Sequence, residues 1–166
     1  MIKFFLKISF IFLLLNSLCA AQIINEVVTS GNKRISKETI IVFGNIEMNK
    51  KDYNELELNL ILKELYKTNF FKEIKLDLTN NILNIYLVEN PIIESLEING
   101  IKKKTFKELI LDKLTLQSRA SYNENIFFKD LNLMKFILKT NGYYFSKIKT
   151  SSIINDKQNS IKLIYD

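Results

Sequence analysis

At 166 residues the chain is long enough for one domain or for two small ones. Hydrophobic residues make up 47% of it and charged residues 25%, which argues against wholesale disorder and favours a buried core. The chain has no histidine, one cysteine and no Gly-rich phosphate loop, so the common nucleophile–base pairs and transition-metal sites cannot be assembled. We therefore expect neither an enzyme nor a bound cofactor or metal.

The first 21 residues predict a signal peptide for export. Lys3 and Lys7 give a positive start, an apolar run follows at 8–15, and small residues precede the expected cleavage between Ala21 and Gln22. The apolar run is shorter than the roughly 20 residues that a membrane-spanning helix needs. An uncleaved membrane anchor remains the alternative hypothesis.

Cleavage leaves 22 basic and 18 acidic side chains, a net charge of +4. Nucleic-acid binding requires a concentrated basic face, and export separates a protein from most nucleic acid, so we expect no nucleic-acid partner. The basic runs at 33–34 and 102–104 lie beside expected turns, which favours solvated loops. The aromatic groups at 70–71, 127–128 and 143–145 are expected to pack where helix meets sheet.

The chain contains an internal repeat. A shift of 69 positions aligns Ile24 with Ile93, Val27 with Leu96, Gly31 with Gly100, Lys33 with Lys102, Arg34 with Lys103 and Ser36 with Thr105. Each half therefore begins with an apolar strand, a glycine turn, a basic pair and a helix start.

The repeated halves predict the same first elements. We expect strands at 23–29 and 92–98, each ended by the aligned glycine, because glycine accepts a positive φ without steric cost. A first helix is expected at 37–43 and at 106–112.

Helix starts follow from capping residues. Ser36 and Thr105 are expected N-caps, and Thr105 with Glu108 forms a capping box. Second helices are expected to begin near Asn54 and Asn123. Each carries an apolar stripe at the helical period: Leu58, Ile61, Leu62 and Leu65 in the first half, and Phe127, Leu131, Met134 and Leu138 in the second.

A hairpin closes each half. In the first, apolar residues alternate at 74–78 and 83–87 around an Asn-Asn turn at 80–81. In the second, strands are expected at 145–154 and 160–165. Both halves therefore predict the order β-α-α-β-β.

The only proline separates the two halves, at Glu89-Asn90-Pro91. Proline lacks an amide donor and restricts the residue before it, so it favours a boundary between strands. We predict a signal peptide at 1–21 and two domains at 22–89 and 92–166. The linker is too short for free tumbling, so their relative orientation should be restricted.

Four stretches resemble a known family: Gly-Asn-Lys-Arg-Ile at 31–35, Leu-Tyr-Lys-Thr-Asn-Phe-Phe at 65–71, Val-Glu-Asn-Pro at 88–91 leading into Ile-Asn-Gly at 98–100, and Asn-Gly-Tyr-Tyr at 141–144. With the repeat and the leader, they resemble the first two POTRA domains of the BamA family of outer-membrane β-barrel assembly factors, over residues 22–166.

This resemblance implies an α+β fold of two tandem POTRA-like units. Each would be a three-stranded mixed sheet with its last strand central and two antiparallel helices on one face. The first hairpin strand would then be a sheet edge that binds clients by β-strand addition, with the groove beside the first helix taking client side chains. The expected client-binding residues are Lys72, Ile74, Leu76, Leu78, Lys147, Ile148, Lys149 and Ile153.

The resemblance also implies a function on the periplasmic side of the outer membrane. The chain would be a non-enzymatic polypeptide-binding module of outer-membrane β-barrel protein assembly. Its partners would be unfolded outer-membrane β-barrel proteins, the lipoproteins of the assembly machine and periplasmic chaperones.

BamA-like proteins continue into further POTRA domains and a membrane barrel, and no residues here are left for barrel strands. We therefore expect a fragment that associates with the membrane through a C-terminal barrel. Alternative hypotheses are the POTRA pair of a two-partner secretion transporter and a membrane-anchored POTRA scaffold. A KH-type RNA-binding core is disfavoured because neither half has the Gly-x-x-Gly clamp.

Overall fold

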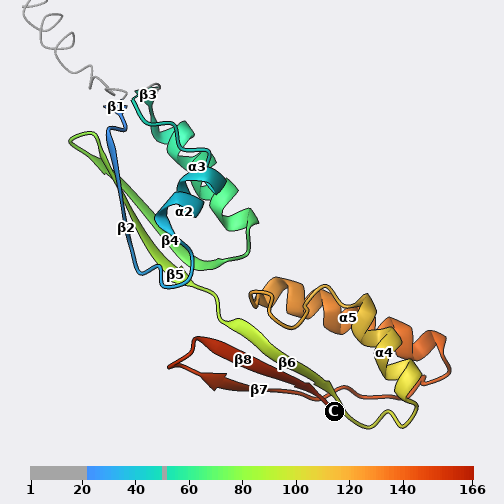
Figure 1. Cartoon of the computed structure of the whole chain (residues 1–166). Coiled ribbons are helices and arrows are strands. Elements are labelled where there is room, and N and C mark those ends of the chain that lie inside the picture. Colours follow the sequence, from blue (N-terminus) through green and yellow to red (C-terminus); the bar gives the residue numbers. More distant parts are fainter. Residues whose placement is uncertain (1–21, 50–51) are drawn as a thin grey trace, which may run out of the picture.

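The computed structural model describes residues 22–49 and 52–166 of the chain. The predicted signal peptide at 1–21 lies outside the described residues. Two helix-covered sheets are joined by the short connection between β5 and β6 (Figure 1). The elements up to β5 are called unit one below, and those from β6 onward unit two.

Unit one follows the predicted order of strand, helix, helix and hairpin. Its elements are β1 (Gln22–Ile23), β2 (Glu26–Ser30), α2 (Lys37–Phe43), β3 (Asp52–Tyr53), α3 (Glu55–Lys67), β4 (Phe71–Thr79) and β5 (Ile82–Glu89). The single first strand predicted at 23–29 is divided into β1 and β2. β1 forms a short antiparallel ladder with β3, which the sequence pattern did not indicate.

Unit two repeats this order with shifted boundaries. Its elements are β6 (Ile92–Ile98), α4 (Lys104–Lys113), α5 (Glu124–Thr140), β7 (Thr150–Asn155) and β8 (Ser160–Tyr165).

The predicted strand start at 145 in unit two is wrong. The chain leaves α5 through turns, in which the Tyr143 amide donates to the Leu138 carbonyl and the Ser146 amide to the Tyr143 carbonyl. Pairing with the last strand begins only at Lys149, which exchanges two backbone hydrogen bonds of 2.8 and 2.9 Å with Asp166. β7 is therefore shorter than predicted.

Each unit has a mixed three-stranded sheet. The strand orders are β2-β5-β4 and β6-β8-β7. The central strands β5 and β8 pair parallel with the first strand of their unit and antiparallel with their hairpin partner. Two helices cover one face of each sheet (Figure 1). These features confirm the predicted α+β fold with the last strand central.

Side-chain caps fix three of the four described helix starts. The Ser36 hydroxyl accepts a hydrogen bond of 3.2 Å from the Thr39 amide at the start of α2. Asn54 and Asn123 cap α3 and α5 in the same way, through their side-chain oxygens. Asparagine and serine are favoured there because their short side chains reach the amides of the first turn.

The predicted capping box at Thr105 and Glu108 is wrong. α4 begins at Lys104, so Thr105 lies inside the helix and Lys103 is the N-cap residue. A lysine side chain has only donors and cannot accept a bond from a first-turn amide. Glu108 instead forms an exposed pair with Lys104 at 3.7 Å.

The Asn-Asn hairpin turn of unit one is confirmed. Asn80 and Asn81 have φ of 54° and 64°, the two left-handed positions of a type I′ turn. Asparagine tolerates this conformation better than most residues do. The turn sets the β4–β5 register, in which Leu78 lies opposite Leu83 and Leu76 opposite Ile85.

The two units have separate hydrophobic cores that share no residue. The core of unit one consists of Ile24, Val27, Ile40, Ile46, Tyr53, Ile61, Leu65, Phe71, Leu83, Ile85 and Leu87. The core of unit two consists of Ile93, Ile98, Ile110, Leu114, Leu116, Met134, Ile137, Leu138, Ile161, Leu163 and Tyr165.

The aromatic groups pack only in part as predicted. Phe71 is buried in the core of unit one, and the Phe127 ring stacks on Tyr165 with centroids 6.0 Å apart. The prediction is wrong for Tyr144 and Phe145, which are 67% and 96% exposed. Both lie in the turn segment before β7 and so have no sheet face to cover.

The two aligned glycines both have positive φ but differ in their surroundings. Gly31 has a φ of 84°, and a Cβ atom there would lie 2.0 Å from the Leu87 carbonyl oxygen. Gly100 has a φ of 74°, and a Cβ atom there would meet nothing within 4 Å. Gly31 is thus required for a close approach of two backbones, whereas Gly100 is required only by its φ.

Substituting the two glycines separates these requirements. Gly100→Ala adds only the strain of a left-handed alanine, about 1–2 kcal/mol. Gly31→Ala adds the clash with Leu87 and should lower the free energy of unfolding by about 2–5 kcal/mol. Urea denaturation followed by circular dichroism measures both values. Equal losses in the two variants would contradict the close approach at Gly31.

Candidate functional site

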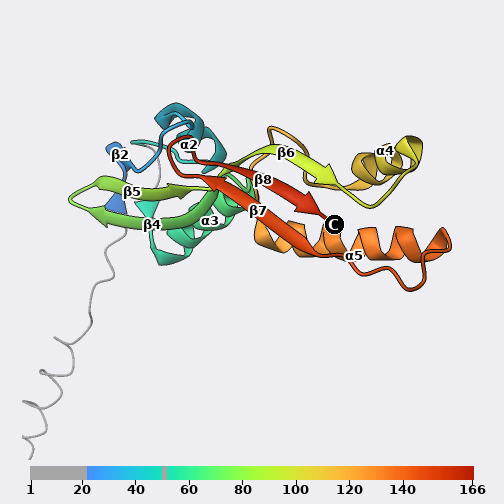
Figure 2. The same cartoon turned by 90° about the horizontal axis from the view of Figure 1, so that it is seen from below.

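The edge strand β4 contains the client-binding residues predicted in unit one. β4 pairs with β5 on one side only. Ile74, Leu76 and Leu78 are half-buried and pack against the core of unit one, while Lys72 is exposed beside a register irregularity between Phe71 and Glu73. All four residues therefore lie on the strand that the sequence predicted as an edge (Figure 2).

The outward backbone groups of β4 can be assigned. The Ile74 amide donates a 3.0 Å hydrogen bond to the Tyr66 hydroxyl of α3, so it points away from β5. Residues of an antiparallel strand alternate in the direction of their backbone groups. Leu76 and Leu78 therefore also direct their N–H and C=O groups outward.

The helix beside the β4 edge is α3. α3 packs against β4, whereas α2 packs against β2 on the other side of the sheet. Side chains of the second helix, with Tyr66 among them, lie next to this edge. Client binding in the groove beside the first helix stays a prediction.

The edge strand β7 differs from the sequence prediction in detail. Lys147 and Ile148 precede the strand, and the Lys149 backbone is bonded to Asp166. By the same alternation, Ile153 directs its backbone groups toward β8. The outward groups of β7 are those of Thr150, Ser152 and Ile154, which sequence reasoning missed because it placed the strand start too early.

The opposite edges of the two sheets are β2 and β6, and loops of the same unit bond to part of each. The Asn49 amide donates to the Ile24 carbonyl just before β2. At β6, the Ile93 amide donates to the Ala120 carbonyl and the Ile93 carbonyl accepts from the Arg119 amide. β4 and β7 are thus the more accessible edges within the described part of the chain.

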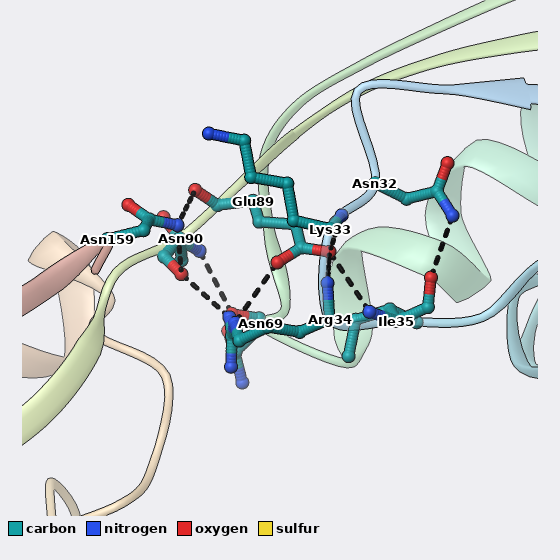
Figure 3. A network of polar contacts seen from close by, with 8 residues as sticks. All are labelled: Asn32, Lys33, Arg34, Ile35, Asn69, Glu89, Asn90 and Asn159. Atoms are coloured by element: carbon teal, nitrogen blue, oxygen red, sulfur yellow. Dashed lines mark hydrogen bonds and ion pairs between the residues drawn. The ribbon is translucent and has the colours of Figure 1, made fainter. Parts of the chain in front are cut away.

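A buried carboxylate closes the loop between β2 and α2. Glu89 is 6% exposed, and its Oε1 accepts hydrogen bonds of 2.7, 2.8 and 3.0 Å from the amides of Lys33, Arg34 and Ile35 (Figure 3). Its Oε2 pairs with the Arg34 guanidinium Nε at 3.0 Å. We call these donors the Glu89 socket. Lys33 and Arg34 are exposed, as predicted for a solvated loop, but the contact of Arg34 with Glu89 was not predicted.

The socket lowers the pKa of Glu89. Burial acts to raise the pKa, but the amides of Ile35, Arg34 and Lys33 and the charge of Arg34 outweigh it, so the pKa lies below 4.5. A carboxyl with a lowered folded-state pKa stabilises the fold above its unfolded pKa. This stabilisation is lost as the pH falls through the folded pKa.

Asparagine side chains bridge the two units. The Asn123 amide group donates to the Asn69 side-chain oxygen at 2.9 Å. The Asn159 amide group lies 3.3 and 3.4 Å from the carbonyls of Glu89 and Asn90 (Figure 3). Asn90 in turn donates to the Asn69 carbonyl at 2.9 Å. We call these residues the asparagine joint.

A second buried carboxylate was also missed from the sequence. Asp130 of α5 is 1% exposed and accepts hydrogen bonds of 2.9 and 2.7 Å from the amides of Thr115 and Leu116. Asp130 therefore holds the backbone at 115–116, just after α4, against α5. Its position on the buried face of an otherwise apolar helix stripe is the one sequence signal that could have identified it.

No group of three or more His, Cys, Asp or Glu residues between 22 and 166, outside the gap at 50–51, could hold a metal ion. No helix in those same ranges combines the length and the apolar character required to cross a membrane.

Comparison with known sequences places this architecture in a family. Residues 91–166 match POTRA, described as a surface antigen variable number repeat. The outer membrane protein assembly factor BamA of Neorickettsia risticii (strain Illinois) is 32% identical over 124 residues, 74% of this chain. The chain contains a POTRA domain and is related to BamA. It spans 16% of the length of that relative.

Solved structures share the POTRA fold. The N-terminal domain of Omp85 from Thermosynechococcus elongatus superposes with a TM-score of 0.56 at 14% identity, over 86% of this chain and 61% of that one. POTRA1-2 of the periplasmic domain of Omp85 from Anabaena gives 0.51 at 12% identity, over 87% and 94%. At these identities the likeness supports the fold alone.

Neutralising Glu89 tests the socket. Glu89→Gln keeps the shape but turns an amide donor toward Arg34, so we expect a loss of about 1.5–3 kcal/mol in unfolding free energy at neutral pH. The stability of the wild type should fall as the pH drops below about 4.5, because Glu89 becomes protonated. The variant should lack this part of the fall. Urea denaturation between pH 7 and pH 3 measures both effects.

Glu97→Gln is the matched control. Glu97 pairs with Lys162 at 2.6 Å, but both side chains are substantially exposed. Such pairs contribute about 0–1 kcal/mol. If the two variants lost equal stability, the buried socket would have no special role in unit one.

Removing one amide from the asparagine joint tests its effect on orientation. Asn159 has a φ of 47°, so Asn159→Gly deletes the bridge without adding backbone strain. We expect a broader distribution of distances between spin labels in the two units, measured by double electron–electron resonance. Asn81→Gly, at a φ of 64° in the β4–β5 turn, is the control and should leave the distribution unchanged. Identical distributions in all three proteins would contradict the joint.

Proposed function

We propose that this POTRA protein is a non-enzymatic polypeptide-binding module of outer-membrane β-barrel protein assembly. The observation that carries the proposal is the pair of accessible sheet edges, β4 and β7, one in each unit. The relationship to BamA supports the assignment to outer-membrane protein assembly.

The edges suit recognition through the main chain. The outward N–H and C=O groups of Leu76 and Leu78, and of Thr150, Ser152 and Ile154, can bond an added strand. Main-chain hydrogen bonds do not depend on the client sequence, so the same edge can accept different unfolded barrel strands. Client binding by the predicted residues at 72–78 and 147–153 is part of this proposal.

The two edges should not be equivalent. In unit one the Tyr66 hydroxyl already accepts from the Ile74 amide, so an added strand would pair from Leu76 onward or displace that bond. In unit two, Ile153 and Ile154 are 59% and 62% exposed, which gives β7 apolar side chains for contact with an apolar client.

The location and partners belong to the same proposal. We place the chain on the periplasmic side of the outer membrane, with unfolded outer-membrane β-barrel proteins as clients and assembly lipoproteins and periplasmic chaperones as partners. We also propose that the units are two domains, at 22–89 and 92–166, because their cores share no residue.

Proline substitution at the β4 edge tests strand addition. Leu76→Pro removes an outward donor while leaving the β4–β5 ladder bonds in place. One main-chain hydrogen bond contributes about 1 kcal/mol, so binding of an unfolded barrel protein should weaken at least about fivefold. Photo-crosslinking from position 77, whose side chain is exposed, measures the change.

Leu76→Ala controls for the lost side chain, because it removes the same packing but keeps the donor. Circular dichroism verifies that both variants fold. If the folded proline variant crosslinked as well as the alanine variant, strand addition at β4 would be refuted. A loss confined to Ser152→Pro, relative to Ser152→Ala, would move the site to β7.

A further inference from the structure

The first part of the β4 edge is closed by a side chain of its own unit. The Ile74 amide points to the side where an added strand would lie, and it donates a hydrogen bond of 3.0 Å to the Tyr66 hydroxyl of α3. The hydroxyl oxygen therefore takes the place that the carbonyl oxygen of a partner strand would occupy. We call this contact the Tyr66 cap.

Short-range contacts hold Tyr66 beside the edge. Leu65, the residue before it, is fully buried, so Tyr66 lies at the margin of the buried face in the last turn of α3. The Thr68 hydroxyl donates to the Leu65 carbonyl at 2.6 Å and accepts from the Phe70 amide at 3.2 Å. The backbone that carries Tyr66 is thus fixed just before β4 begins (Figure 1), while the side chain is 44% exposed and can turn.

The cap lies next to a β-bulge in the same strand. The register shifts between Phe71 and Glu73, which leaves Lys72 as an extra residue on β4. A bulge interrupts the regular pairing that an added strand needs, and the Asn-Asn turn ends the strand on the other side. With the cap in place, the outward amides open to a partner are those at 76 and 78. Without it, the Ile74 amide is added to them.

The edge of unit two is not capped in this way. α3 and α5 align through their capping residues, Asn54 and Asn123. In this alignment the position of Tyr66 falls on Lys135, whose side chain has only donors. Between residues 22 and 166, apart from 50–51, no acceptor pairs with the outward amides of 150, 152 and 154. The cap is therefore a difference between two edges of the same topology.

The cap opposes pairing at Ile74. At 76 and 78 an added strand replaces water as the acceptor of the outward amides. At Ile74 it must displace an acceptor that the fold already holds in place, and it must also move the ring of Tyr66. A single hydrogen bond at an exposed site contributes little net stability, so a client carbonyl can displace the hydroxyl reversibly.

We propose that Tyr66 is a gate on the β4 edge: in the free chain its hydroxyl caps the Ile74 amide, and a client strand must turn the ring aside before it can pair beyond Leu76. The inference rests on the proposed strand addition and deepens it, because it names the residue that sets how far along β4 a client reaches. At β7, where the aligned helix residue is Lys135, a client pairs without displacing such an acceptor.

Amide exchange in the free chain tests the cap without any client. Tyr66→Phe keeps the ring but removes the acceptor, so the Ile74 amide should exchange with solvent about fivefold faster, as measured by NMR. The neighbouring Lys75 amide, which faces β5, should not change. Tyr86→Phe is the matched control, because it removes the hydroxyl of a half-exposed tyrosine of β5, and it should leave both rates unchanged. An unchanged Ile74 rate in Tyr66→Phe would overturn the cap.

Crosslinking to a urea-unfolded outer-membrane β-barrel protein tests the gate. Photo-crosslinkers are placed at 73, beside the capped part of the edge, or at 77, beside the open part, and both positions are exposed. In Tyr66→Phe the crosslinking yield at 73 relative to 77 should rise about fivefold, because one competing hydrogen bond is removed. In Tyr86→Phe the ratio should match that of the wild type.

The outcomes separate the gate from the proposed function. A ratio that stays at the wild-type value in Tyr66→Phe would overturn the gate while leaving strand addition in place. A ratio that falls would also overturn the gate, by showing that the hydroxyl contacts the client instead of excluding it. Crosslinks absent from both positions in all three proteins would refute strand addition at β4, and the gate with it.

Discussion

The burial of one carboxylate, Glu89, organises the end of unit one. Its three amide donors and the Arg34 guanidinium hold the loop after β2 against the end of β5. An unpaired buried carboxylate would be costly, so the socket and its ligand must form together. Because Glu89 is the last residue of β5, the same contact fixes where the chain leaves unit one and enters the joint with unit two.

The topology of the sheets determines where a partner strand can bind. With the last strand central, each sheet has a parallel edge and an antiparallel edge. Loops bond to the start of the parallel edges, at Ile24 and Ile93, and leave the hairpin strands β4 and β7 accessible. A short repeated unit thus provides one accessible edge per copy, which suits recognition of extended chains without sequence selectivity.

Sequence patterns predicted the local elements better than the contacts between distant residues. The Asn-Asn turn, the stripe of α3 and the cap at Ser36 depend on neighbouring residues and were predicted correctly. The start of β7 depends on where β8 ends, and the roles of Glu89 and Asp130 depend on amides far away in sequence. Periodicity carries no information about such pairings, so the socket and the outward groups of β7 required the structure.

The asparagine joint has a thermodynamic consequence. The two cores share no residue, and the bonds that cross between the units are donated by the amide side chains of Asn123 and Asn159. Bending the units apart would expose little hydrocarbon and so would change the heat capacity only slightly. The free energy of bending the tandem should therefore change almost linearly with temperature, without the curvature expected for a hinge closed by apolar packing.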